Sequence, residues 1–264
     1  MTVPLRPISR LFACLLVGCS LTSALAEEIT VAAAADLQFA FKDIAGRFEK
    51  DTGNSIKLVF GSSGNFTNQI KNGAPFDMFF SADIGYPRQL ESEGLVEPGT
   101  LYHYANGKIV LWARQGSNVA VARGLTLLLD RAISKIAIAN PQHAPYGRAA
   151  VAALRHEGIY EQVQHKLVLG ENISQTAQFV ETGNADAGIV ALSLVVAPAM
   201  RGKGKYWLIP ESWYPAIEQG CVILKSSQHK QVAQQFLAYL KKPETVKLMQ
   251  EYGFVVPKAA TVAN

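Results

Sequence analysis

The chain has 264 residues, of which 49% are hydrophobic and 17% charged, so it is long and apolar enough for one large or two modest domains. Its formal net charge of +4 comes from basic residues that are scattered along the chain without forming a run. This pattern excludes a disordered chain and a nucleic-acid-binding surface, and it favours a small molecule as the partner.

The first 26 residues have the pattern of a secretory leader. Arg6 and Arg10 give a basic start, residues 11–21 are apolar, and an Ala-Leu-Ala sequence ends at Ala26. We therefore expect a signal peptide that is cleaved after Ala26, with the mature protein in the periplasm. A second interpretation stays open, because the Leu-Val-Gly-Cys sequence ending at Cys19 resembles the box of bacterial lipoproteins, in which the cysteine is lipidated and anchors the chain to a membrane.

The placement of the cysteines excludes a disulfide within the mature chain. Cys14 and Cys19 lie in the leader, so Cys221 remains alone, in a run of strand character. We interpret Cys221 as a buried small hydrophobic residue rather than as a reactive thiol or a metal ligand.

The mature chain opens with an apolar run of strand length at residues 28–35, and apolar residues then recur at helical spacing. A helix is predicted to begin at Asp36. Four alanines at residues 32–35 leave the backbone uncrowded at this point. The unpaired N–H groups of the first helical turn are therefore able to face an anion.

Strands and helices continue to alternate along the rest of the chain. A strand at 55–60 ends in a hydroxyl-rich turn at 61–65, and a continuously apolar strand at 75–82 precedes a helix at 83–95. Further strands are predicted at 107–113, 135–140, 166–169, 187–193 and 218–225, and two closing helices at 232–240 and 243–252. This alternation predicts an α/β protein with doubly wound, mostly parallel sheets flanked by helices.

The number of elements is sufficient for two lobes with a ligand cleft between them. We expect residues 27–106 together with 223–264 to form lobe I, and residues 107–222 to form lobe II. Ligands of such sheets bind at the carboxyl ends of the strands.

Neutral hydrogen-bond donors recur where these strands meet the following helices. Brought together, they would bind an oxyanion without a buried arginine or lysine, because helix N-termini supply positive potential. The same residue types also serve as ordinary helix caps, so periodicity alone leaves both interpretations open. The candidate residues are Ala35, Asp36, Ser62, Ser63, Tyr146 and Ile173.

Other kinds of chemistry lack their motifs. The five histidines show no i,i+4 pairing and no nearby carboxylate, so no metal site is predicted. Tyr102 and Tyr104 are interpreted as packing residues rather than ferric ligands, because no carboxylate cluster accompanies them. The glycine-rich turn is too short for a nucleotide P-loop, and no cofactor is expected. Ser62 and Ser63 lie outside a Gly-x-Ser-x-Gly elbow and have no identifiable base, so a periplasmic serine hydrolase is kept only as an alternative.

At these junctions the chain resembles the periplasmic molybdate-binding proteins of ABC importers, over residues 28–257. The resemblance implies a two-lobed, monomeric protein that closes on molybdate or tungstate and hands it to a membrane permease, with no chemical step. The motifs that carry it are Ala-Ala-Ala-Asp-Leu (33–37), Phe-Gly-Ser-Ser (60–63), Gly-Ala-Pro-Phe-Asp-Met-Phe-Phe-Ser-Ala-Asp (73–83), Asn-Pro-Gln-His-Ala-Pro-Tyr-Gly (140–147), Gly-Glu-Asn-Ile (170–173), Gly-Ile-Val (188–190) and Tyr-Gly-Phe (252–254).

The resemblance also implies which residues hold the anion. The family's hydroxyl residue after the first strand falls on Asp36, its loop serine on Ser63, a loop donor on Tyr146 and a backbone donor on Ile173. A ligand tyrosine of some members is replaced by Ala191, and we hypothesise that Tyr146 supplies the lost phenol. Further lining is expected from Ala35, Ser62 and Ala191.

Asp36 is the unusual residue in this set, because a carboxylate facing a dianion would be repelled. We predict that its side chain caps the following helix and that only its N–H meets the ligand. The alternative is that Asp36 accepts a hydrogen bond from a protonated oxyanion, which would favour phosphate over molybdate. Sulfate or phosphate is accordingly the alternative ligand.

Overall fold

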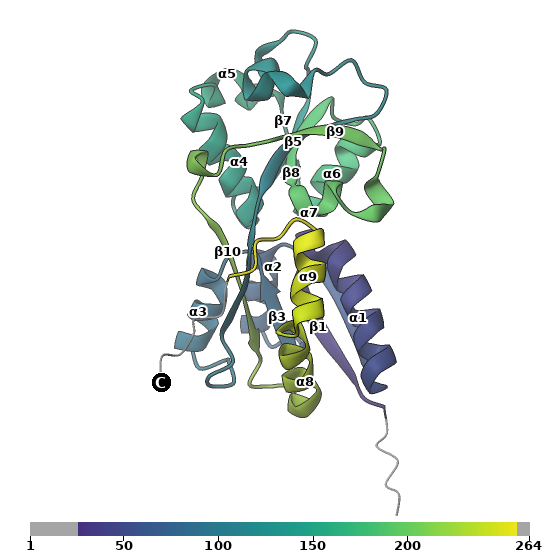
Figure 1. Cartoon of the computed structure of the whole chain (residues 1–264). Coiled ribbons are helices and arrows are strands. Elements are labelled where there is room, and N and C mark those ends of the chain that lie inside the picture. The colour runs from purple at the N-terminus through teal and green to yellow at the C-terminus, as the bar shows by residue number, and fades with distance from the viewer. Residues whose placement is uncertain (1–25, 258–264) are drawn as a thin grey trace, which may run out of the picture.

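The computed structural model describes residues 26–257. They form two lobes, each built around a five-stranded sheet and stacked one above the other in Figure 1. The two-lobed α/β fold expected from the sequence is confirmed. The leader, with its cleavage and lipid-attachment interpretations, depends on residues 1–25, which lie outside the described residues.

The sheet of lobe I has the strand order β2-β1-β3-β10-β4. Its central strand β1 (Glu28–Ala34) runs parallel to β2 (Ser55–Gly61) on one side and to β3 (Met78–Ser81) on the other. The strand β10 (Ile217–Ile223) then pairs antiparallel with both β3 and β4 (Tyr102–Gly107).

The sheet of lobe II has the order β7-β6-β8-β5-β9 and repeats this arrangement. Here β6 (Ile136–Ala139) runs parallel to β7 (Leu167–Gly170) and to β8 (Ala187–Ala191). The strand β5 (Ile109–Arg114) pairs antiparallel with β8 and β9 (Gly204–Leu208). The carboxyl ends of β1 and β2 therefore have equivalents in β6 and β7.

The chain passes between the sheets twice, between β4 and β5 and again between β9 and β10. The sequence-based boundary after residue 222 falls near the end of β10, which pairs within the lobe I sheet. An apolar run reveals that a strand is buried but not which sheet it joins. We therefore propose Lys108 and residues 209–216 as the two crossings.

Helices cover both faces of the lobe I sheet. On one face lie α1 (Gln38–Thr52), α8 (Lys230–Leu240) and α9 (Pro243–Glu251), and Figure 1 shows α9 beside α1 and above α8. On the other lie α2 (Ser63–Lys71) and α3 (Gly85–Ser92).

Successive side chains of a strand point to opposite faces of the sheet, as two neighbouring residues of β3 show. The ring of Phe80 packs on those of Phe41 and Phe236, whereas the ring of Phe79 packs on that of Phe66. These contacts fix α1 and α8 on one face and α2 on the other, and so set where each helix begins.

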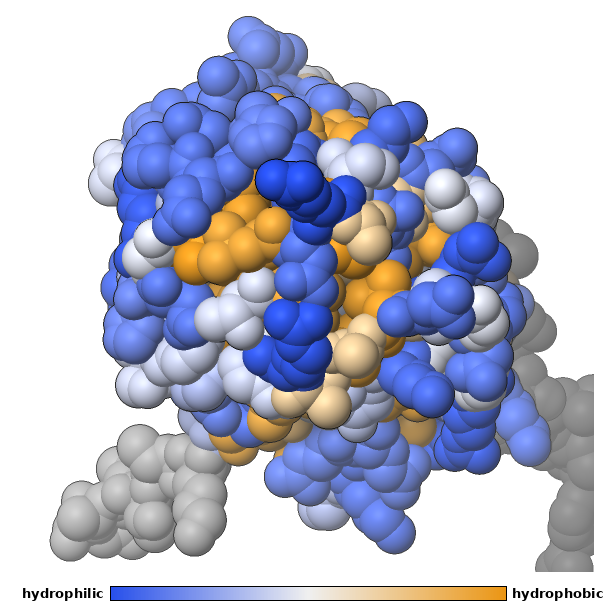
Figure 2. Space-filling model, turned by 90° about the horizontal axis from the view of Figure 1, so that it is seen from above, coloured by the Kyte–Doolittle hydropathy of each residue, from blue (hydrophilic) through white to orange (hydrophobic). Residues whose placement is uncertain are grey.

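Lobe II has α4 (Pro145–His156) and α6 (Ile173–Glu181) against its sheet, with the short helices α5 (Tyr160–Val163) and α7 (Leu192–Val195) beside them. Figure 2 shows the molecule from above, and on this face hydrophilic side chains surround several apolar patches. Scattered apolar side chains of this kind are usual on protein surfaces. In the described part of the chain, 3-10 segments lie at Ala35–Leu37, Val121–Leu129, Gln164–Lys166, Pro198–Met200 and Glu211–Trp213.

The first of these segments refines one prediction. The chain after β1 makes a 3-10 turn at Ala35–Leu37, and the α-helix itself begins at Gln38 rather than at Asp36. Within residues 26–257, no helix is both long enough and apolar enough to cross a bilayer.

Candidate functional site

Four strand-to-helix junctions meet where the lobes face each other, two from each lobe. They line a small cavity of ≈ 10 Å³, about the space of one water molecule. The cavity is lined by Ala34, Ala35, Asp36, Gly61, Ser62, Ser63, Ala82, Ala144, Pro145, Tyr146 and Ile173. The structure therefore gathers six of the seven residues named from the sequence around one small space.

Ala191, the seventh, is not among the lining residues. It ends β8, is fully buried and precedes α7. Its neighbour Ser193 contacts the site instead, because the Ser193 hydroxyl donates to the backbone oxygen of Asp36 at 2.8 Å. The end of β8 thus supports the site through the backbone of Asp36.

The side chain of Asp36 is buried, with 1% of its surface exposed. Its Oδ2 accepts hydrogen bonds from the hydroxyl of Tyr146 at 2.8 Å and from Nε2 of Gln219 at 2.7 Å. Neither the 3-10 turn nor α1 has a side-chain cap, so the prediction that Asp36 caps its helix is wrong. Its donors come from positions distant in sequence, which local capping rules do not register.

Gln219 was missed by the sequence reasoning, although it holds this carboxyl in place. It is a fully buried residue of β10, and its Oε1 accepts from the hydroxyl of Tyr104 at 2.8 Å. That bond directs Nε2 towards Asp36 and towards the Tyr146 hydroxyl at 2.9 Å. A glutamine close to the apolar run of a strand is the signal that could have identified it, since a buried polar side chain needs partners.

Gly107 makes room for this network at the crossing between the lobes. A Cβ atom there would collide with the hydroxyl of Tyr146 and with the amide of Gln219. The absence of a side chain at Gly107 is therefore a condition for the Tyr146–Asp36–Gln219 contacts.

Burial controls the protonation of the site. It raises the pKa of Asp36 from 3.8 to about 6, against the opposing effect of the bonds from Gln219 and Tyr146. Burial and the nearby Asp36 charge also raise the pKa values of Tyr104 and Tyr146 well above 10. Both phenols are therefore neutral hydrogen-bond donors at physiological pH.

The two serines at the end of β2 differ in their contacts. Ser63 is fully buried, and its Oγ accepts from the N–H of Ala82 at 2.9 Å. No bond donated by that hydroxyl forms within residues 26–257, so its proton is free for a ligand. Ser62 lies at the N-terminus of α2, with its Oγ 2.9 Å from Nδ1 of His143.

His143 is a second residue that the sequence reasoning missed, since no histidine had been paired with either serine. Its Nε2 lies 3.6 Å from Oε1 of Glu171, a side chain that is 63% exposed. The Ser62–His143 contact spans the two lobes and supplies the neighbouring base that the sequence did not identify. Among the described residues, no group of three or more His, Cys, Asp or Glu side chains is placed to hold a metal ion.

Lobe II contributes two helix N-termini to the cavity. Tyr146 lies in the first turn of α4, directly after Pro145, and Ile173 is the first residue of α6. Asn172 caps α6 by accepting from the N–H of Gln175 at 3.0 Å. Within residues 26–257 the backbone N–H groups of Tyr146 and Ile173 have no acceptor, and the two helix N-termini carry positive potential towards the cavity.

Direct contacts hold the lobes closed around the cavity. The Gly64 N–H donates to the His143 oxygen at 2.9 Å, and the Asn65 amide donates to Glu171 at 2.9 Å. An ion pair joins Arg148 to Asp83 at 2.6 Å, and a tyrosine hydroxyl of α3 accepts from the same arginine at 3.2 Å.

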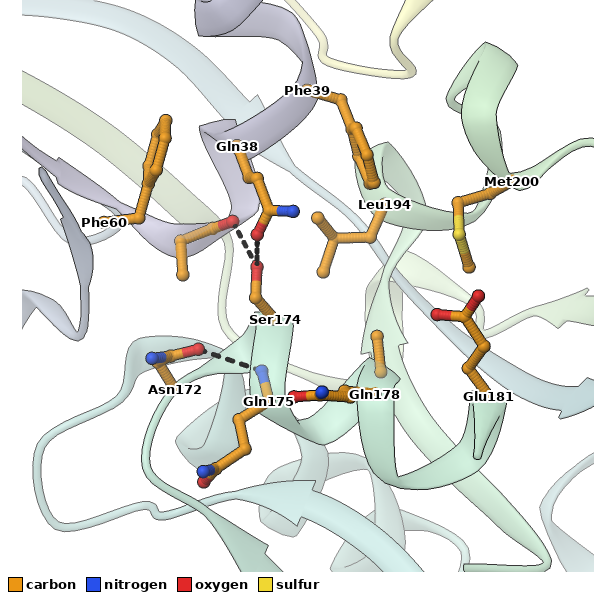
Figure 3. A pocket seen from close by; sticks show the side chains of 12 residues that line it. Gln38, Phe39, Phe60, Asn172, Ser174, Gln175, Gln178, Glu181, Leu194 and Met200 are labelled. Atoms are coloured by element: carbon orange, nitrogen blue, oxygen red, sulfur yellow. Dashed lines mark hydrogen bonds between the residues drawn. The ribbon is translucent and has the colours of Figure 1, made fainter. Parts of the chain in front are cut away.

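A larger groove of ≈ 500 Å³ adjoins the cavity between α1 and α6 (Figure 3). It has a mixed lining, with Phe39 and Met200 among the apolar residues and Glu181 among the polar ones. Ser174 lies at its inner wall, where its hydroxyl is 2.8 Å from the Ala35 oxygen and 2.7 Å from the Gln38 amide oxygen. This lobe-to-lobe contact separates the groove from the buried cavity.

Comparison with known proteins places this geometry in context. The family model described as bacterial extracellular solute-binding protein matches residues 29–255. A protein of Azotobacter vinelandii named molybdate-binding protein ModA is 41% identical over 247 residues, covering 94% of this chain and 97% of the relative. The protein of the same name from Rhodobacter capsulatus is 39% identical over 241 residues, covering 91% of this chain and 93% of the relative.

A solved structure has the same fold. The periplasmic molybdate-binding protein of Azotobacter vinelandii superimposes with a TM-score of 0.83 at 35% identity, covering 87% of this chain and 100% of that chain.

Proposed function

The chain belongs to the bacterial extracellular solute-binding proteins, and on this premise we propose that it captures molybdate outside the cytoplasm and delivers it to an ABC importer. The family predicted from the sequence motifs is confirmed by the relatives of known name. The observation that supports the proposal most directly is the small cavity, around which the structure gathers junction residues from both lobes.

The binding mode follows from the kinds of groups around the cavity. The anion is held by backbone N–H groups at Asp36 and Ile173 and by the Ser63 hydroxyl. Tyr146 lines the cavity, and its phenol donates to the carboxyl of Asp36. No lysine or arginine is among the lining residues of the described chain. Helix N-termini retain a dianion through directional bonds and positive potential, and they do so without a fixed cation that would also bind other anions.

Closure links binding to delivery. The Ser174–Ala35 and Gly64–His143 contacts join the lobes around the cavity, so an anion that bonds to both lobes stabilises the closed form. The permease then distinguishes the loaded, closed protein from the empty one. The protein acts in the periplasm as a monomer, released by cleavage after Ala26, with lipid attachment at Cys19 as the alternative.

The ligand is a tetrahedral oxyanion, and molybdate and tungstate are proposed ahead of sulfate and phosphate. Both relatives carry molybdate in their names. Discrimination among these anions comes from the size of the cavity and from which anion oxygens carry a proton.

The Ser62–His143 contact raises the question of hydrolysis, since a histidine beside a serine is the core of a serine hydrolase. Ser62 lies outside a Gly-x-Ser-x-Gly elbow, however, and the matching family model describes solute-binding proteins. We therefore propose a carrier without a chemical step.

Isothermal titration calorimetry of the mature chain tests the proposal. Molybdate and tungstate should bind at one site per chain, whereas sulfate and phosphate should bind at least a hundredfold more weakly. An activated ester serves as the enzymatic control and should be hydrolysed no faster than in buffer. Equal binding of sulfate and molybdate, or ester turnover that molybdate does not inhibit, would overturn the proposed function.

A further inference from the structure

The two carboxylate oxygens of Asp36 have different surroundings. Oδ2 accepts two hydrogen bonds, from Tyr146 and Gln219. Oδ1 is buried and has no hydrogen-bond partner within residues 26–257. A buried polar atom without a partner is costly, and in a binding site it is the atom to expect a ligand or a proton on.

Neutral groups surround this carboxyl. Tyr146 on α4 and Gln219 on β10 donate to it, and Tyr104 on β4 orients the glutamine. The imidazole of His143 reaches the cavity wall only through a serine hydroxyl. None of these groups carries a fixed positive charge that would keep the carboxyl ionised.

Charged side chains on three neighbouring helices are paired with other groups. On α1, Asp43 pairs with Arg47 at 3.0 Å. On α4, Arg148 pairs with an aspartate of lobe I at 2.6 Å, and on α6, Glu181 pairs with Lys203 at 2.7 Å. In the described part of the chain no ion pair includes the carboxyl of Asp36, so a dianion in the cavity would meet an uncompensated negative charge.

On the basis of the proposed function, we propose that Asp36 takes up a proton from solvent when molybdate enters and binds the anion as a neutral carboxylic acid. The proton sits on Oδ1, because Oδ2 is occupied as an acceptor by Tyr146 and Gln219. From Oδ1 it is donated as a hydrogen bond to an oxygen of the anion. Repulsion between two negative charges is thereby replaced by an additional donor.

The environment of Asp36 in the closed structure already favours its protonation. Burial raises the pKa of Asp36 to about 6, and a dianion beside the carboxyl raises it further. Above pH 6 the free site is mostly ionised while the loaded site is protonated, so one proton accompanies each anion. The apparent dissociation constant then rises about tenfold per pH unit.

Proton uptake distinguishes this mechanism from one in which Asp36 remains an ionised carboxylate when the anion binds. A carboxylate that stays ionised would accept a hydrogen bond from a protonated anion such as hydrogen phosphate, and no proton would be taken up. Asparagine reproduces the neutral acid, since its oxygen accepts from Tyr146 and Gln219 while its NH₂ group donates to the anion.

Calorimetry at pH 7.5 in two buffers with different ionisation enthalpies measures the proton uptake directly. We expect about one proton per molybdate and a dissociation constant that weakens about tenfold from pH 7 to pH 8. Asp36→Asn should take up no proton, have a flat pH profile, and bind at pH 8 at least as tightly as the wild type. His143→Gln should retain the proton uptake, which excludes the imidazole as its source.

The wild-type measurement stands even if a variant fails to fold. Tight molybdate binding without proton uptake would overturn this inference and leave the proposed function intact. A folded Asp36→Asn protein that binds more than tenfold more weakly at pH 7 would also overturn it, because an ionised acceptor would then be required. Failure of the wild type to bind molybdate at all would reject the proposed function itself.

Discussion

The two lobes share one strand order but bring different chemistry to the cavity. In lobe I the ends of β1 and β2 present Asp36 and Ser63, a buried acid and a buried hydroxyl. At the equivalent ends of β6 and β7, lobe II presents Tyr146 and Ile173, a phenol and a backbone N–H. Asp36 and Ser63 of lobe I thus bring a carboxyl group and a hydroxyl to the cavity, whereas Tyr146 and Ile173 of lobe II bring neutral donors.

This difference shows that the strand order determines where the helix N-termini lie, whereas the residue types determine which hydrogen bonds they make. Parallel strands place the following helix N-termini at one edge of each sheet, so both lobes offer anion-binding backbone. The residues then determine which bonds form. The bond from Tyr146 to Asp36 joins the two lobes, and therefore it exists only when they are closed.

The largest loss of molybdate affinity is expected from a substitution that prevents the two lobes from closing. Gly64→Val should weaken molybdate binding at least a hundredfold, because a Cβ at Gly64 would lie 2.8 Å from the His143 backbone oxygen of the other lobe. Overpacking against rigid backbone costs about 3 kcal/mol. Calorimetry measures the affinity. Gly46→Val is the matched control, since nothing lies within 4 Å of a Cβ there, and equal losses in both variants would reject the steric explanation.

The second prediction concerns the substitution Asp36→Asn, which removes the carboxyl charge that lobe I brings to the cavity. The folded-state pKa of Asp36 is raised from 3.8 to about 6, so the stability of the neutral acid is fully present below pH 3.8 and is lost as pH rises through 6. The shift corresponds to about 3 kcal/mol. Asp36→Asn should therefore stabilise the ligand-free protein by about 2 to 3 kcal/mol at pH 8, and hardly at all at pH 3.5.

Urea unfolding at both pH values measures this difference. A stabilisation that is the same at pH 3.5 and pH 8 would mean that the charge of Asp36 is not its cause.

The third prediction removes the phenol of lobe II. Tyr146→Phe should weaken molybdate binding about 10- to 30-fold, because Asp36 loses the hydroxyl that donates to its Oδ2 and holds the carboxyl in place. Titration calorimetry at pH 7 gives the ratio. Tyr160→Phe on α5 is the control in the same lobe and should bind as the wild type does. Wild-type affinity in Tyr146→Phe would show that the phenol has no role in binding.

The smallest effect concerns a contact that only supports closure. Ser174→Ala removes the hydroxyl that contacts Ala35 and Gln38 in lobe I and should weaken binding about fivefold, for about 1 kcal/mol. Asn65→Ala cuts an exposed contact to Glu171 and should change the affinity less than twofold. If the two variants had equal effects, burial of the closing contact would not matter.

Much of the fold was predictable because it depends on local patterns. Apolar periodicity predicted the alternating strands and helices, and the uncrowded alanines before Asp36 indicated an anion site built from backbone. The motifs at the junctions identified the family. These features depend on residues that are close together in the chain, where spacing alone carries the information.

The sequence by itself determined the two-lobed α/β fold and the set of junction donors, whereas the tertiary structure decided what the donors do. Asp36 was expected to cap its own helix, but it accepts from Tyr146 and Gln219, which are 110 and 183 positions away. His143 meets Ser62 across 81 positions in the same way. Local rules cannot register such contacts, because burial and partner geometry exist only after both sheets have formed and the lobes have met.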